Sequence, residues 1–117
     1  MSICVAGSAA YDTVFAFSGR FQSQLLKSRL DHLNVCFPAA SMERRFGGCG
    51  GNIAYACRLL GDPTVLLSAF GANDADAYLK HLKACGIAVV PTLVENAYTA
   101  QCVILSDASG SQIATFC

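Results

Sequence analysis

A glycine-rich stretch in the first half of the chain carries the residue types that suit close binding of a small polar molecule. Residues 46–56 read FGGCGGNIAYA, with an asparagine immediately after the glycines and before an apolar segment. Glycine has no Cβ, so the backbone at Gly48 and Gly51 can approach a ligand closely, and N–H groups at a helix start attract polar or anionic partners. Asn52 offers a donor and an acceptor, or else caps the expected helix. The stretch predicts a site for a hydroxylated or anionic small molecule.

Three charged residues could complete such a site. Asp12 follows the first expected strand, at the edge where open α/β sheets bind ligands, and a carboxylate can accept hydrogen bonds from two vicinal hydroxyls. Arg44 and Arg45 precede the glycines and could neutralise phosphate charge, although paired arginines also occur as solvated strand ends or in salt bridges. Four phenylalanines could form an apolar wall for a purine or pack in the core instead: Phe15, Phe17, Phe37 and Phe46.

Strands and helices alternate through the middle of the chain and would hold these residues. Apolar runs predict buried strands at 3–6, 65–70 and 87–94, the last with a proline that suits an edge strand or a bend. Helical spacing predicts helices over 52–60 and from Asn73 or Asp74 to 84, ended by Gly61 and Gly86. This alternation is typical of a parallel α/β sheet with right-handed crossovers.

Further β segments lie on either side of this core. Residues 13–18 alternate and turn at Gly19, residues 42–46 are expected to be extended, and segments 99–105 and 112–116 flank a polar hairpin turn. Residues 22–33 are consistent with either a short helix or an irregular excursion. The pattern predicts a small second β layer.

Composition narrows the function classes. The chain has 117 residues, enough for one domain, and its hydrophobic content of 54% against 14% charged residues predicts exposed apolar patches or self-association. A net charge of +0 argues against nucleic acid or an anionic membrane surface as partners. No signal peptide and no apolar run of the ~18 residues that a membrane helix needs is found. We therefore expect a cytoplasmic protein.

Other chemistries find no support in the motifs. The seven cysteines show no C-x-x-C pair or zinc-ligand spacing, so we expect no metal site and interpret them as small buried side chains in a reducing compartment. The glycine stretch lacks the Gly-Lys-Ser/Thr ending of a phosphate-binding P-loop and the G-x-G-x-x-G spacing of a dinucleotide-binding turn. No catalytic triad can be defended from the sequence.

The same residues carry a resemblance to a known family. Tyr11-Asp12, Gly19-Arg20-Phe21, the segment RRFGG at 44–48 with GNIAY at 51–55, and AFGANDADAY at 69–78 resemble the N-terminal part of the PfkB, or ribokinase-like, sugar and nucleoside kinases. The match looks closest to bacterial adenosine-kinase-like members. Cys49 stands where some sugar-kinase relatives carry lysine, which favours nucleosides over simple sugars, unless Cys49 is only a neutral filler of the loop.

The resemblance implies a fold and a set of roles. The fold would be a ribokinase-like α/β parallel sheet with flanking helices and a small β lid, truncated at the C-terminal side. Residues 1–117 would form its substrate-binding and lid portion, with lid segments at about 13–46 and 95–117. The resemblance implies sugar contacts for four residues: Asp12, Gly48, Gly51 and Asn52. It implies phosphate or lid contacts for Arg44 and Arg45.

The implied reaction is ATP-dependent phosphorylation of a sugar or nucleoside, with adenosine or a related ribonucleoside accepting phosphate at its 5′-hydroxyl. ATP and Mg²⁺ would be cofactors of the full-length family, and the lid would mediate a homodimer. The family's later motif, which resembles D-T-x-G-A-G-D and carries the catalytic aspartate, does not occur in this sequence. We therefore expect no catalytic residue here and no activity of the chain alone. A non-catalytic nucleoside-binding module and an inert truncated fragment remain alternatives.

Overall fold

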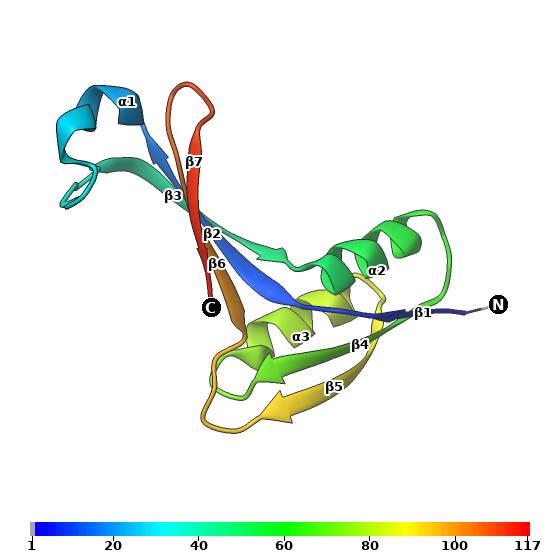
Figure 1. Ribbon diagram of the computed structural model, residues 1–117. Coiled ribbons are helices and arrows are strands. Elements are labelled where there is room, and N and C mark those ends of the chain that lie inside the picture. The colour runs from blue at the N-terminus through cyan, green and yellow to red at the C-terminus, as the bar shows by residue number, and fades with distance from the viewer. Residues whose placement is uncertain (1) are drawn as a thin grey trace.

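The protein contains two β-sheets in the computed structural model, which describes residues 2–117 (Figure 1). The chain passes between the sheets three times, after β1, after β3 and after β5. Three parallel strands form the first sheet in the order β1 (Ile3–Ala6), β4 (Thr64–Gly71) and β5 (Ala88–Val94). The second sheet has the order β3 (Ala39–Gly47), β2 (Ala10–Phe17), β6 (Ala100–Ser106) and β7 (Gln112–Phe116). The expected α/β class, with a parallel sheet and a small second β layer, is confirmed.

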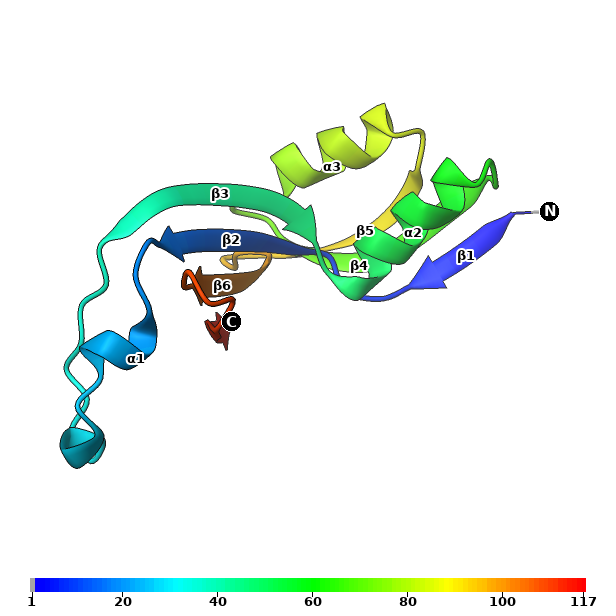
Figure 2. The same ribbon diagram turned by 90° about the horizontal axis from the view of Figure 1, so that it is seen from above.

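Two helices cover one face of the parallel sheet (Figure 2). Helix α2 (Cys49–Leu59) packs on β1 and β4, and helix α3 (Ala75–Ala84) packs on β5. Both helices are followed by a glycine with positive φ, as predicted for Gly61 and Gly86. The core between helices and sheet is made of side chains that are almost completely buried: Val5, Ala54, Leu66, Phe70, Tyr78 and Leu82.

The opposite face of the parallel sheet is bare in this chain. Leu67, Val90 and Val94 are 38%, 58% and 46% exposed, although parallel strands are normally covered on both faces. The bare face contributes to the exposed apolar surface, and the predicted exposed apolar surface is confirmed.

The second sheet begins earlier than the sequence pattern predicts. Strand β2 starts at Ala10 and not at residue 13, because residues 10–16 pair with β3 on one side and with β6 on the other. Asp12 therefore lies within a strand and not in a turn after β1. Strand β3 likewise starts at Ala39 because its whole length pairs with β2.

A small cluster closes the far end of the second sheet. The segment left open by the sequence contains the short helix α1 (Phe21–Gln24) and a 3₁₀ turn at Lys27–Arg29. Asp107, in the turn between β6 and β7, accepts hydrogen bonds from the backbone N–H groups of Phe21, Ser109 and Ser111 and from the Ser109 hydroxyl. One carboxylate thus fastens the turn to α1. The Phe17, Phe21 and Phe37 rings pack beside it with centroids 4.8–6.1 Å apart.

Two sequence expectations concern the cysteines and membrane helices. All seven cysteines are free, but the expectation that they are buried is wrong for four exposed ones: Cys4, Cys36, Cys49 and Cys117. Within residues 2–117, no helix has both the length and the apolar character to cross a bilayer.

Asp107→Asn should flatten the pH dependence of stability. Hydrogen bonds, led by that from Ser109, lower the pKa of Asp107 from 3.8 to about 2. The folded pKa lies below the unfolded one, so the carboxylate stabilises the fold above pH ~4 and this contribution is lost as the pH falls through about 2. Thermal melts between pH 2 and 7 would measure it. The exposed Asp31, changed to Asn, serves as control, and equal pH profiles for both variants would contradict the assignment.

Candidate functional site

The glycine stretch forms the junction at which β3 passes into helix α2. Gly48, with φ +87°, is the residue before the helix, and the helix starts at Cys49. The prediction that the helix begins near Asn52 is therefore wrong by one turn. Two of the glycines lie inside the helix despite their low helix propensity, because tight packing against other segments holds them there.

Ser8 occupies two of the N–H groups at this helix start. Its hydroxyl accepts the Cys49 N–H at 3.1 Å, and its carbonyl accepts the Gly51 N–H at 3.1 Å. The Asn52 N–H bonds to the Gly48 carbonyl at 2.9 Å within the helix. The expectation that the N–H groups of the glycine stretch stay open to a ligand is therefore wrong for Cys49, Gly51 and Asn52. A capping role for Asn52 is also wrong, because Gly48 is the N-cap residue. The exposed Asn52 side chain is left for another role.

The glycines are required by contacts within the protein. A Cβ on Gly47 would overlap the Asp12 carboxylate, and a Cβ on Gly51 would overlap the Tyr78 hydroxyl. A Cβ on Gly50 would come within 2.5–2.8 Å of the Gly7 backbone at the end of β1. Missing side chains thus let strand, helix and loop approach one another, and Gly47 specifically makes room for the carboxylate of Asp12.

Three of the four predicted sugar-contact residues line one cavity of about 400 Å³: Asp12, Gly48 and Asn52. Ala100 and Cys102 of β6 and Phe116 of β7 line the same cavity from the strands next to β2. The cavity therefore joins a carboxylate and an amide to an apolar wall, the usual make-up of a site for a small polar molecule. Gly51 lines a neighbouring cavity of about 370 Å³, which Asn52 also borders.

Ser8, Cys102 and Phe116 were not predicted from the sequence to belong to this site. Cys102 and Phe116 reach it because β6 pairs with β2 and β7 pairs with β6, placing Cys102 beside Asp12 and Phe116 beside Cys102. Ser8 reaches it from the segment between β1 and β2. No local pattern signals these pairings. The four phenylalanines considered as a purine wall lie elsewhere. Phe15 leaves β2 on the face opposite Asp12, Phe17 and Phe37 lie in the distal cluster, and Phe46 stacks on His81 at 4.1 Å.

The two arginines lie on opposite faces of the second sheet. Arg45 stands opposite Asp12 in the β2–β3 pairing, so its side chain leaves the same face, where it bonds to Glu43 at 2.6 Å. Both partners of that pair are well exposed, and such surface pairs contribute little to stability. The Arg44 guanidinium lies over the Tyr11 ring, 3.9 Å from its centroid, on the other face.

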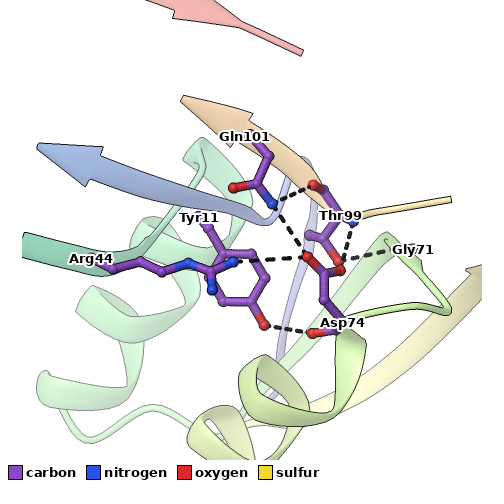
Figure 3. Close-up of polar contacts among 6 residues, drawn as sticks. All are labelled: Tyr11, Arg44, Gly71, Asp74, Thr99 and Gln101. Atoms are coloured by element: carbon purple, nitrogen blue, oxygen red, sulfur yellow. Dashed lines mark hydrogen bonds and ion pairs between the residues drawn. The ribbon is translucent and has the colours of Figure 1, made fainter. Parts of the chain in front are cut away.

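Asp74 joins the two sheets on that other face (Figure 3). Its carboxylate accepts the Thr99 N–H at 2.8 Å and the Gln101 side-chain amide at 3.3 Å, and it lies 3.8 Å from Arg44. Its backbone carbonyl accepts the Tyr11 hydroxyl at 2.7 Å. Burial is the main cause that raises the pKa of Tyr11, so this hydroxyl remains a donor. The predicted N-cap position is confirmed for Asp74, but its side chain holds the second sheet and does not cap α3.

Comparison with known proteins places these features in a family context. A family model for the pfkB family carbohydrate kinases matches residues 4–117. The chain is similar to a Burkholderia thailandensis nucleoside kinase solved in complex with inosine, with 36% identity and a TM-score of 0.77 over 99% of this chain. It also shares its fold with a Methanocaldococcus jannaschii nucleoside kinase, at 24% identity and a TM-score of 0.81 over 99% of this chain.

A third similar structure is a ribokinase from Cryptococcus neoformans var. grubii serotype A in complex with ADP, at 24% identity and a TM-score of 0.78 over the whole of this chain. The chain spans 36% of the length of both nucleoside kinases and 35% of that of the ribokinase.

Gly47→Ala should displace the Asp12 side chain. Because the new methyl group would overlap the carboxylate, we expect a loss of about 1–3 kcal/mol in the free energy of unfolding, typical of overpacking. Urea denaturation measures it. Adding Asp12→Ala removes the overlapping group, so the double variant should recover much of the loss. If the two substitutions instead destabilise additively, the contact is not the cause.

Asp74→Ala should loosen the connection between the sheets. It removes the acceptor of the Thr99 and Gln101 bonds and leaves Arg44 without its ion pair, which we expect to cost about 2 kcal/mol of unfolding free energy. The matched control is Asp76→Ala, an exposed acidic residue in the first turn of the same helix. Equal effects of the two changes in urea denaturation would count against a joining role for Asp74.

Proposed function

This chain belongs to the pfkB family of carbohydrate kinases, and from that premise we propose that residues 1–117 form the substrate-binding and lid portion of an ATP-dependent sugar or nucleoside kinase. The observation that carries the proposal is the convergence of Asp12 and Asn52 on one cavity with an apolar far wall. The proposed lid is the second sheet with its distal cluster, corresponding to segments of about 13–46 and 95–117.

The substrate that we propose is adenosine or a related ribonucleoside, phosphorylated at its 5′-hydroxyl. Asp12 would accept hydrogen bonds from the two vicinal ribose hydroxyls, and Asn52 would donate to and accept from the same sugar. Gly48 would let the sugar approach the backbone, while Phe116 would offer an apolar surface to the base. The inosine complex of the similar Burkholderia thailandensis kinase supports a nucleoside over a free sugar.

The two arginines receive different proposed roles. Arg45, on the face that carries Asp12, would contact phosphate, since its present partner Glu43 is exposed and easily exchanged. Arg44 would act as a lid contact, because it lies against Tyr11 and Asp74. Gly51 would serve the site indirectly by accommodating the Tyr78 hydroxyl.

The residues of this chain do not fit a Mg²⁺ site. Within residues 2–117 no three metal-ligating side chains lie together, and Asp12 is the one acidic side chain that lines the cavity. Apart from the phosphate contact proposed for Arg45, we assign no residue here to ATP, and we assign none to the metal or to proton abstraction. We propose that the chain alone binds substrate without transferring phosphate. A non-catalytic nucleoside-binding module remains the second candidate, because the proposed sugar contacts Asp12 and Asn52 need no catalytic residue to bind a ribose.

The lid is also the proposed surface for a homodimer. Met42, Val103 and Ile113 lie on the face of the second sheet opposite Asp12, where they are 64%, 37% and 51% exposed. Pairing of two such faces would remove this apolar surface from water.

Isothermal titration of the chain with inosine, adenosine and the 2′-deoxy forms tests the proposal. We expect the ribonucleosides to bind more tightly than the 2′-deoxy compounds, and Asp12→Ala to weaken ribonucleoside binding at least tenfold, since each charge-assisted hydrogen bond contributes about 1.5–3 kcal/mol. The exposed Asp31, changed to Ala, is the control. With ATP and Mg²⁺ added, the chain alone should form no nucleoside monophosphate.

Ribonucleosides that bind no better than their 2′-deoxy forms, or an Asp12→Ala variant that binds as tightly as the unchanged chain, would contradict the proposed site. Binding of adenine alone with the same affinity as adenosine would show that the ribose is not recognised.

A further inference from the structure

Tyr78 reaches the glycine stretch from helix α3, a part of the chain that lines no wall of the Asp12 cavity. Its side chain is 1% exposed, and its hydroxyl donates a hydrogen bond of 2.5 Å to the backbone carbonyl of Gly47. This bond connects the middle of α3 to the last residue of β3. It is the type of contact that fixes a peptide plane, because a carbonyl bonded from a rigid side chain cannot rotate freely.

The residues packed around Tyr78 restrict its hydroxyl to a single position. The ring meets Tyr11, Phe46 and Phe70 edge to face, with centroid distances of 5.6, 5.0 and 5.6 Å. The hydroxyl itself rests against Gly51, where no side chain could be accommodated. Burial, followed by the negative charge of Asp12, raises the pKa of Tyr78 to about 12. The hydroxyl therefore stays protonated and can donate its hydrogen bond to the Gly47 carbonyl.

The residue that accepts this bond is also the one on which the Asp12 carboxylate lies. The three outer atoms of the Asp12 side chain would all overlap a Cβ added to Gly47. Tyr78 thus holds Gly47 by its carbonyl, and the Asp12 carboxylate lies in the space left by the missing Gly47 side chain. The three residues form a continuous series of neighbours from the core of the protein to the cavity.

We propose that Tyr78 is a positioning residue for Asp12: it fixes the Gly47 peptide and thereby sets the orientation in which the Asp12 carboxylate faces the cavity. This orientation of the carboxylate is present in the ligand-free protein. The consequence for binding rests on the proposed function, in which Asp12 accepts hydrogen bonds from ribose hydroxyls.

Tyr78→Phe is the variant that isolates this role, because it removes the hydroxyl and keeps the ring. We expect the dissociation constant for inosine to rise about fivefold, the change that corresponds to one misaligned hydrogen bond between Asp12 and the ribose. Leu66→Val, which removes one methylene from a fully buried core position on β4, is the control for general destabilisation and should leave the constant unchanged.

A double-mutant cycle with Asp12→Ala separates positioning from a purely structural role. If Tyr78 acts through Asp12, Tyr78→Phe should have no further effect on the inosine dissociation constant once Asp12 is alanine. A fivefold effect that persists in the Asp12→Ala background would overturn the proposal, because the hydroxyl would then act on the site by another route.

A measurement without ligand tests the proposal even if inosine does not bind. In carbon-detected NMR of the free chain, Tyr78→Phe should shift the carbonyl resonance of Gly47 and the side-chain carboxyl resonance of Asp12, and Leu66→Val should shift neither. A shift at Gly47 with none at Asp12 would overturn the positioning role. Failure of inosine to bind the unchanged chain, with both shifts present, would count against the proposed function alone.

Discussion

The candidate site depends on how closely separate backbone segments approach one another at the start of helix α2. Gly50 packs on Gly7, Gly51 leaves space for the Tyr78 hydroxyl, and Gly47 leaves space for the Asp12 carboxylate. A side chain at any of these positions would push strand, helix or loop apart. The glycine-rich sequence is thus first a packing requirement of the protein itself, and the cavity is a consequence of the side chains that this packing brings together.

The walls of the cavity come from parts of the fold that must hold a fixed relation to each other. Asp12 and Phe116 belong to the second sheet, whereas Asn52 belongs to a helix that packs on the parallel sheet. Asp74 ties the two parts together through Thr99, Gln101 and Arg44, on the face away from the cavity. Any movement of the second sheet relative to the parallel sheet would strain the hydrogen bonds and the ion pair of Asp74, because these contacts connect the two parts.

Much of this fold could be predicted from the sequence, but the chemistry of the site could be predicted only in part. Apolar runs and helix-ending glycines locate β1, β4 and α3 within about a residue, because burial and chain reversal are local properties. The family resemblance grouped Asp12, Gly48, Gly51 and Asn52, and the first, second and fourth of these line one cavity. Other features depend on contacts between segments that are distant in the sequence. These features are the start of α2, the partners of its N–H groups, the position of Arg44 over Tyr11 and the presence of Phe116 in the cavity. A tyrosine at a core position of a helix, such as Tyr78, likewise gives no local sign that its hydroxyl reaches the site.

We propose that the close approach at Gly47 orients Asp12 towards a ribose in the cavity beside Asn52. A crystal structure of this chain soaked with inosine would show where and how the sugar binds. We expect the 2′- and 3′-hydroxyls within hydrogen-bonding distance of the Asp12 carboxylate, the Asn52 amide on the same sugar, and the Tyr78–Gly47 bond intact. Inosine bound elsewhere, for example in the neighbouring cavity lined by Gly51, or an Asp12 side chain turned away from a bound ribose, would contradict it.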